Sequence, residues 1–113
     1  LEMAAASGVA VELRLADIPF LPQAVELAGY GMLPAGSFAN KRYCADAVSV
    51  AAGLDPIRCD LVFDAQTSGG LVLAVPEGKV AAARQMLEAA GDLAAVIGRV
   101  MEEEEGESRL RIR

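Results

Sequence analysis

The sequence predicts an α+β fold in which a single sheet of four to five strands carries helices packed on one face. Three observations lead to this prediction. Residues 71–75 form an unbroken apolar run, as in a central strand that is buried on both faces. Residues 79–90 repeat apolar side chains at helical spacing. The chain then ends in two further strand patterns, so strands and helices alternate irregularly, which fits one sheet with helices on it.

The first third of the chain predicts a helix, a strand and a second helix. Residues 1–7 have the composition of a helix interior, and Gly8 is placed to end that helix in the left-handed conformation. Residues 9–15 alternate apolar and polar side chains, as a half-buried strand does. Residues 22–29 begin with a proline suited to a first helical turn and end with a glycine. Because the chain starts inside a helix pattern and not with methionine, we expect a piece of a longer protein.

The middle of the chain predicts a loop, a weak strand and a short helix. Residues 31–40 are punctuated by two glycines and a proline, which favours a loop. Residues 43–51 resemble a strand, although their alanines weaken the pattern. Asp55 precedes a proline, as an N-cap residue does, so residues 55–63 predict a helix. A strand through residues 61–63 is the alternative, and periodicity alone leaves it open.

The last third predicts one helix and two strands after the apolar run. The helix, residues 79–90, places Val80, Ala83, Leu87 and Ala90 on one face and ends at Gly91. Residues 93–101 predict a strand. Residues 108–113 alternate three arginines with Leu110 and Ile112, which is typical of a half-solvated edge strand. A three-arginine anion site is the alternative interpretation.

Composition excludes several classes of function. The net charge of −6 and the scattered basic residues argue against nucleic acid or anionic membrane as a partner, because both require clustered lysine and arginine. No apolar run is long enough to span a membrane. Histidine, the usual general base and metal ligand, is absent. Cys44 and Cys59 match no metal or redox motif, so we expect reduced, partly buried thiols in a cytoplasmic protein. The acidic residues 102–107 predict a solvated turn without a metal site.

The most informative segment is the polar loop that precedes residues 71–75. It combines hydroxyl, amide and carboxylate side chains with two adjacent glycines: Asp64, Gln66, Thr67, Ser68, Gly69 and Gly70. The loop has neither the Lys-Ser/Thr ending of a P-loop nor a G-x-G-x-x-G motif. A simple turn and a ligand-contacting loop both remain open. Asn40 is a further polar residue in a predicted loop, and it would ordinarily bond only its own backbone. No catalytic constellation is recognisable in the 113 residues.

Residues 64–72 resemble the D-P-Q-T-S-G-G-L-L signature in the C-terminal domain of selenophosphate synthetases (selenide, water dikinases), members of the aminoimidazole ribonucleotide synthetase-like superfamily. Other segments match in the family's order. Residues 1–4 resemble the helix after its T-D-V-T-G-F-G segment, and residues 18–22 its I-P-x-L-P turn. Residues 36–40 resemble its glycine-to-asparagine loop and residues 96–100 its I-G-x-V strand. Ala65 departs from the signature by replacing its proline, which loosens the backbone.

The resemblance implies an enzyme that makes selenophosphate from selenide and ATP, with magnesium, and releases AMP and phosphate. Residues 1–113 would be the C-terminal domain of a two-domain, cytoplasmic and homodimeric synthetase. The N-terminal ATP-binding domain, with the reactive cysteine or selenocysteine, the lysine and the metal-binding aspartates, lies outside this chain. The chain then contributes no catalytic or metal-binding residue, needs no cofactor of its own and is inactive alone.

The resemblance also implies which side chains line the ATP cleft. These cleft-side positions are Asp64, Gln66, Thr67, Ser68, Gly69, Gly70 and Asn40, with a role in positioning the substrate and excluding water. Two other interpretations stay open. The chain could belong to a related superfamily enzyme with another substrate, or form a stand-alone, non-catalytic module that binds a nucleotide or a partner protein.

Overall fold

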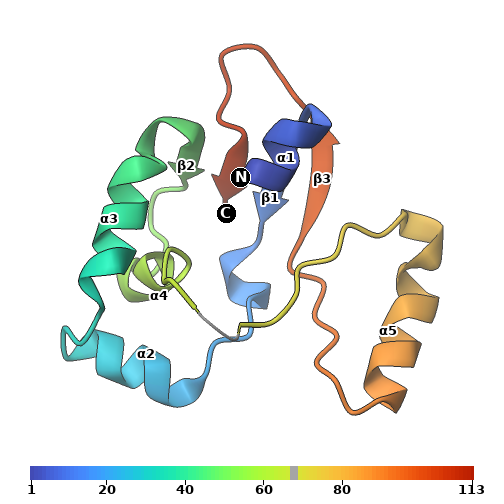
Figure 1. The fold of residues 1–113 in the computed structure, drawn as a ribbon, viewed down its shortest axis with the longest axis horizontal. Coiled ribbons are helices and arrows are strands. Elements are labelled where there is room, and N and C mark those ends of the chain that lie inside the picture. The colour runs from blue at the N-terminus through green and yellow to red at the C-terminus, as the bar shows by residue number, and fades with distance from the viewer. Residues whose placement is uncertain (67–68) are drawn as a thin grey trace.

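One mixed sheet of four strands forms the centre of the molecule (Figure 1). The structure, a computed structural model, describes residues 1–66 and 69–113. Strand β1 (Val9–Leu13) pairs antiparallel with β3 (Gly98–Glu102) and parallel with β4 (Leu110–Ile112). Strand β2 (Val48–Val50) pairs parallel with β4, so the strand order is β2-β4-β1-β3. The sheet and its helices confirm the predicted α+β class.

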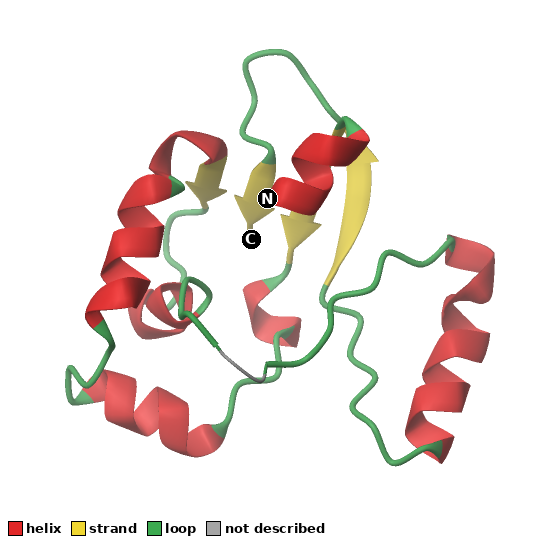
Figure 2. Cartoon of the chain, in the orientation of Figure 1, coloured by secondary structure: helices red, strands yellow, loops and turns green. Residues whose placement is uncertain are grey.

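The helices divide into two groups (Figure 2). Helices α2 (Pro22–Gly29) and α3 (Ala35–Tyr43) both contact α4 (Pro56–Leu61) near the β2 side of the sheet, and α1 (Glu2–Ser7) packs on β1. Helix α5 (Val80–Ala89) stands apart on the β3 side and has no fully buried residue. Three 3₁₀ turns complete the described structure: η1 (Leu15–Asp17), η2 (Ala45–Ala47) and η3 (Glu77–Lys79).

The hydrophobic core lies where β4, η1 and α4 meet. Its buried members are Leu15, Cys59, Phe63 and Ile112, and Ile112 has no exposed surface at all. Partly buried apolar side chains surround this cluster, including Phe20, whose ring lies 5.8 Å from the Arg58 guanidinium carbon. The core therefore anchors α4 and the residues that follow it directly onto the sheet.

Several predicted elements are confirmed. Gly8 ends α1 with φ of 62°, and β1 and α2 lie within their predicted ranges. Asp55 is the N-cap of α4, because its Oδ1 accepts a hydrogen bond from the Ile57 backbone amide at 2.9 Å. Helix α4 runs to Leu61, which removes the alternative strand through residues 61–63.

The prediction of a loop over residues 31–40 is wrong in its second half, because α3 starts at Ala35. Pro34 occupies the N-cap position in an extended conformation, and Gly36 lies in the first helical turn. Glycine disfavours a helix by only about 1 kcal/mol, and contacts of α3 with α4 outweigh that cost. The predicted strand over residues 43–51 is shortened to β2, because α3 ends at Tyr43 and the turn η2 occupies residues 45–47.

The apolar run 71–75 is not a central strand, which corrects the sequence-based prediction. The structure assigns no strand there, and Leu71, Val72 and Leu73 are 90%, 62% and 58% exposed. An apolar run shows that a segment can be buried, but burial also needs a covering surface, which the described residues do not supply to these side chains. The strand predicted over residues 93–101 is present but shorter, because β3 starts at Gly98 and ends at Glu102.

Residues 108–113 do contain the last strand, but β4 is an inner strand and not an edge strand. Its apolar side chains face the core, while Arg109 and Arg111 form ion pairs with the acidic turn. Arg109 pairs with Glu103, and Arg111 lies 3.8 Å from Glu104. Alternation distinguishes the two faces of a strand but not its place in the sheet. Of the three arginines of the alternative anion site, Arg109 is thus hydrogen-bonded to the turn, whereas Arg111 Nη2 is buried and has no hydrogen-bond partner among the described residues.

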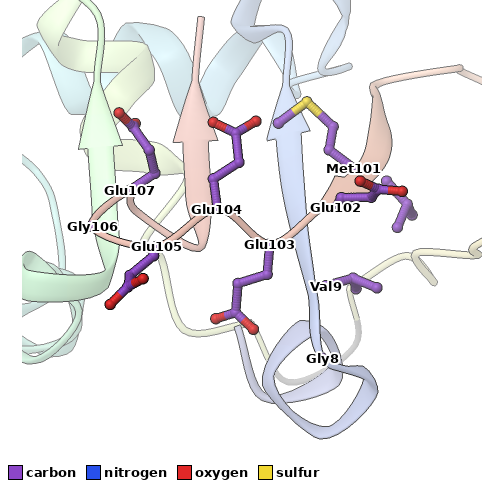
Figure 3. A pocket seen from close by; sticks show the side chains of 10 residues that line it. Gly8, Val9, Met101, Glu102, Glu103, Glu104, Glu105, Gly106 and Glu107 are labelled. Carbon is purple, nitrogen blue, oxygen red and sulfur yellow. The ribbon is translucent and has the colours of Figure 1, made fainter.

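The acidic turn between β3 and β4 is exposed, as predicted, and lines an open depression together with the end of α1 (Figure 3). Glu104 and Glu107 extend to one side in this view, and Glu103 and Glu105 to the other. The two arginines contact different sides of the turn: Arg111 of β4 approaches Glu104 and Glu107, whereas Arg109, just before β4, pairs with Glu103.

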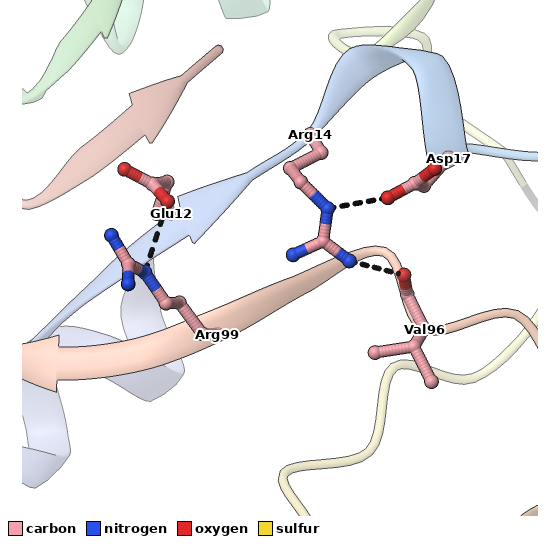
Figure 4. Close-up of polar contacts among 5 residues, drawn as sticks. All are labelled: Glu12, Arg14, Asp17, Val96 and Arg99. Carbon is pink, nitrogen blue, oxygen red and sulfur yellow. Dashed lines mark hydrogen bonds and ion pairs between the residues drawn. The ribbon is translucent and has the colours of Figure 1, made fainter.

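Polar contacts reinforce the pairing of β1 with β3 (Figure 4). Glu12 on β1 and Arg99 on β3 form an ion pair at 3.0 Å. Arg14 donates a hydrogen bond to the Val96 carbonyl at 2.9 Å and pairs with Asp17 of η1. The hydrogen bond between Arg14 and Val96 joins the end of β1 to the segment before β3, where the regular strand pairing stops.

Candidate functional site

One face of α3 holds the polypeptide that leads into the polar loop. Asn40 and Lys41 follow Ser37 by three and four residues, so both lie on the same side of α3 as Ser37. Lys41 Nζ lies 2.6 Å from Asp60 Oδ1 on α4. Ser37 and Asn40 contact the two residues at the start of the loop. We call residues 63–64 the stem of the loop.

Two hydrogen bonds connect α3 to the stem. The Ser37 hydroxyl donates to Asp64 Oδ1 at 2.6 Å, and Asn40 Nδ2 donates to the Phe63 carbonyl oxygen at 3.0 Å. The Phe63 carbonyl lies just beyond the end of α4, where carbonyl groups have no partner within the helix. Asn40 therefore caps the chain after α4, and its expected bond to its own backbone is replaced by a bond to a residue 23 positions away.

Burial at the interface between α3 and the stem is local, because the flanking residues Gly36, Asn40 and Ala65 are exposed. Ser37 is only 2% exposed and is a buried polar residue of the described chain. A methyl group placed on Gly36 would lie 4.0 Å from the Ala65 side chain, which is ordinary van der Waals contact. The Phe63 ring is inserted into the hydrophobic core. Burial of the Ser37 hydroxyl is tolerated because the Asp64 carboxylate accepts its hydrogen bond.

The outer part of the loop faces solvent. Gln66, Gly69 and Gly70 are exposed, and the Gln66 side chain lies over Gly69, where a β-carbon would be 2.8 Å from Gln66 Oε1. Thr67 and Ser68, two of the predicted site residues, lie outside the described residues. The structure thus brings together Asn40 and Asp64 at the stem, with Gln66, Gly69 and Gly70 further along the chain.

Sequence reasoning missed Ser37. The signal was the spacing of Ser37 and Asn40, which become neighbours only if residues 35–43 form a helix. Because these residues were predicted as a loop, the shared face was not recognised.

Cys59 is the buried thiol of this region and lies on α4. Burial raises the pKa of Cys59, the Lys41 ammonium opposes that effect, and the carboxylates of Asp60 and Asp55 raise the pKa further. A thiol with a raised pKa is a poor nucleophile at neutral pH. Cys59 is therefore a core residue, in agreement with the prediction of a partly buried, unreactive cysteine.

A second surface feature lies on the other side of the molecule. An apolar groove of about 220 Å³ runs between β1, the apolar residues 71–75, the segment before β3 and α5. The half-buried side chains of α5 that line it are Val80, Ala83 and Leu87, the face predicted from helical spacing, whereas Ala90 is exposed. Arg84 donates a hydrogen bond to the Ala94 carbonyl at 3.1 Å across this groove.

Within residues 1–66 and 69–113, no three acidic or cysteine side chains are arranged to hold a metal ion. In the same residues, every helix is too short or too polar to cross a membrane.

Comparison with known proteins gives consistent matches over the entire chain. Residues 1–111 match the family described as AIR synthase related protein, C-terminal domain. The chain is 48% identical, over all 113 residues, to the selenide, water dikinase of Nitratidesulfovibrio vulgaris (strain DSM 19637 / Miyazaki F), and covers 32% of that protein. It is 40% identical over 105 residues to selenide, water dikinase 2 of Peptoclostridium acidaminophilum, covering 92% of this chain and 30% of that protein.

A third relative, the selenide, water dikinase of Caldanaerobacter subterraneus subsp. tengcongensis, is 39% identical over 92% of this chain, which covers 30% of that protein. The chain thus spans about a third of the length of the relatives that it matches. The family match covers residues 1–111 and therefore nearly all of the α+β fold described above. The chain belongs to the family of AIR synthase related proteins, as their C-terminal domain.

Proposed function

We propose that the chain is the C-terminal lobe of a selenophosphate synthetase, which makes selenophosphate from selenide and ATP and releases AMP and phosphate. The observation that carries the proposal is the identity of 48% over the whole chain with a selenide, water dikinase. In addition, the loop at residues 64–70 retains every residue of the family signature except the proline, which is replaced by Ala65.

In this proposal the lobe lines and closes the ATP cleft of an N-terminal domain of the same protein. The cleft-side residues are the outer loop residues Gln66, Thr67, Ser68, Gly69 and Gly70, supported from behind by Asp64 and Asn40. The exposure of Gln66, Gly69 and Gly70 supports a contact with something outside the lobe. Their role is to position the nucleotide and to exclude water, because this set includes no histidine or lysine that would activate a hydroxyl for bond making.

The family resemblance implies that the aspartates that bind magnesium lie in a domain outside this chain. We therefore assign the metal, the reactive cysteine or selenocysteine and the catalytic lysine to the N-terminal domain. The proposal includes a homodimer for the full-length protein and a cytoplasmic location. The two free thiols support a reducing compartment.

The experiment that tests the proposal compares the 113-residue chain with the longer gene product that contains it. The coding sequence upstream of Leu1 is determined, and both proteins are assayed for AMP and selenophosphate formed from ATP and selenide. We expect selenide-dependent AMP formation by the longer protein and none by the chain alone, because the groups that make and break bonds lie in the other domain.

Other outcomes would identify the alternatives. ATP consumption by the longer protein that requires a different acceptor and ignores selenide would show a related superfamily enzyme with another substrate. A gene that encodes only this domain, with nucleotide binding by the chain itself, would show a stand-alone binding module. Selenide-dependent turnover by the chain alone would contradict the proposed division between the two domains.

A further inference from the structure

The site residues that the family resemblance implies fall into two groups in this structure, which differ in their contacts. Gln66, Gly69 and Gly70 are exposed in the outer loop. Asp64 is half-buried and Asn40 is exposed, but each directs a polar atom toward a neighbouring protein group, Asp64 toward the Ser37 hydroxyl and Asn40 toward the Phe63 carbonyl. The two sets therefore have different partners, and their chemical roles differ accordingly.

We propose that Ser37, Asn40 and Asp64 form a clamp that positions the outer loop, and that the negative charge of Asp64 has no direct role at the nucleotide. This inference rests on the proposed function and deepens it, because it divides the cleft-side residues into groups that meet the substrate and groups that hold the loop. Ser37 becomes a positioning residue of the reaction.

The geometry supports this assignment. Ser37 is 2% exposed, and its hydroxyl oxygen lies 2.6 Å from Asp64 Oδ1. The donor side of this hydrogen bond is therefore shielded from water. Removal of the acceptor would leave a buried hydroxyl without a partner, which is more costly than removal of an exposed hydrogen bond. The bond at Asn40 lies on the same face of α3 and fixes the preceding residue of the stem.

The chemistry of the clamp requires an acceptor at position 64 and does not require a charge. The side chain of asparagine has the same shape as that of aspartate and retains the oxygen that accepts from Ser37. A carboxylate that bound a metal ion or a lysine of another domain would instead depend on its charge. Asp64→Asn therefore separates a positioning role from an electrostatic one, whereas Asp64→Ala removes both.

The test measures kcat and the KM for ATP of the longer gene product with four substitutions. We expect Asp64→Ala and Ser37→Ala to lower kcat by about 10- to 100-fold, because small displacements of positioning groups have effects of this size. We expect Asp64→Asn and Ser37→Thr to stay within about threefold of the unsubstituted protein, because both retain the hydrogen bond. Asp92→Ala, which removes an exposed carboxylate on the other side of the molecule, is the matched control.

A second measurement does not depend on turnover. Amide hydrogen exchange at Phe63 and Asp64, whose amides donate to the Asp60 and Leu61 carbonyl oxygens, should become faster in Ser37→Ala and Asp64→Ala and stay unchanged in Asp64→Asn. Exchange in β1 and β4 should remain the same in all variants. A loss of activity in Asp64→Asn as large as in Asp64→Ala would overturn the clamp in favour of a direct charge effect. Unchanged exchange and activity in Ser37→Ala would also overturn it.

The two proposals fail in different ways. If the longer protein has no selenide-dependent activity, the proposed function fails, but the exchange measurements still test the clamp. If the activity is present and Ser37→Ala has no effect on either readout, the clamp fails and the proposed function stands.

Discussion

At the residue scale, burial in the core changes the acidity of the Cys59 thiol. Cys59 is 5% exposed and packs against Phe63 and Ile112 in the same cluster. Its pKa is raised, first because burial disfavours the thiolate. The folded protein therefore retains the thiol proton at pH values at which the unfolded chain has lost it.

This shift predicts a pH dependence of stability. Because the folded pKa is raised, the contribution of Cys59 is fully present below the ordinary thiol value of 9.0. It is lost as the pH rises from that value through the folded pKa, since the unfolded state then binds fewer protons. We expect the free energy of unfolding to fall more steeply above this pH in the unsubstituted chain than in Cys59→Ala. Urea titrations at a series of pH values measure the difference.

Cys44→Ala is the matched control for this prediction, since Cys44 is only partly buried. The variant should retain the steep fall. Equal pH profiles for the unsubstituted chain and Cys59→Ala would show that the thiol ionises as easily in the folded protein as in the unfolded chain.

Also at the residue scale, the sequence predicted the stem residues but not what they do. Asn40 and Asp64 were identified from the family resemblance. Their partners, the Phe63 carbonyl and Ser37, lie more than 20 positions away in each case, and no local pattern links such residues. Asp55 shows the opposite case, since its N-cap bond reaches only two residues along the chain and was therefore predictable.

At the element scale, the pairing of β1 with β3 depends on the absence of a side chain at Gly98. Gly98 lies opposite Leu13 in the register, and a β-carbon at that position would be 2.0 Å from the Glu12 carbonyl oxygen. Glycine in a strand often marks such a close approach of two backbones. The glycine of the I-G-x-V segment thus has a structural reason in this sheet.

We expect Gly98→Ala to destabilise the chain by about 1–3 kcal/mol, because the two strands must separate to admit the methyl group. Gly78→Ala is the control, since nothing lies within 4 Å of its added β-carbon, and it should change stability by less than about 0.5 kcal/mol. Thermal and urea unfolding of both variants provide the measurement. A similar, small effect for both would contradict the close approach of β1 and β3.

The element scale also shows where periodicity was sufficient. Residues 80–89 form a helix with its half-buried residues on the predicted face, because helical spacing is a property of the local sequence. Residues 35–43 have a weaker pattern and become helical through contacts with α4. Residues 71–75 have a strong apolar pattern but no covering surface among the described residues.

At the scale of the whole molecule, β4 joins the two ends of the fold. It pairs with β1 from the start of the chain and with β2 from the middle, and its Ile112 is fully buried in the core shared with α4. Both pairings of β4 are parallel, so they join segments that are distant in the sequence. The last residues are therefore central to the folded structure.

We expect Ile112→Ala to lower the free energy of unfolding by about 2–5 kcal/mol, because a fully buried side chain is replaced by a cavity. Val50 pairs with Ile112 in the register but is 43% exposed, so Val50→Ala should cost about 1 kcal/mol or less. Chemical denaturation of both variants checks the contrast. Equal losses would place the two residues in equivalent environments and contradict the inner position of β4.

The sequence by itself determined the α+β class, the ends of α1 and α2, the start of α4, the family resemblance and the identity of the polar loop. These properties depend on residues that are neighbours along the chain: a cap and its amide, a repeat of apolar residues, a continuous motif. Only the tertiary structure decided that β4 is an inner strand, that α3 is a helix and that Ser37 bonds to Asp64. Each of these depends on hydrogen bonds or burial between distant segments, and folding alone brings those segments together.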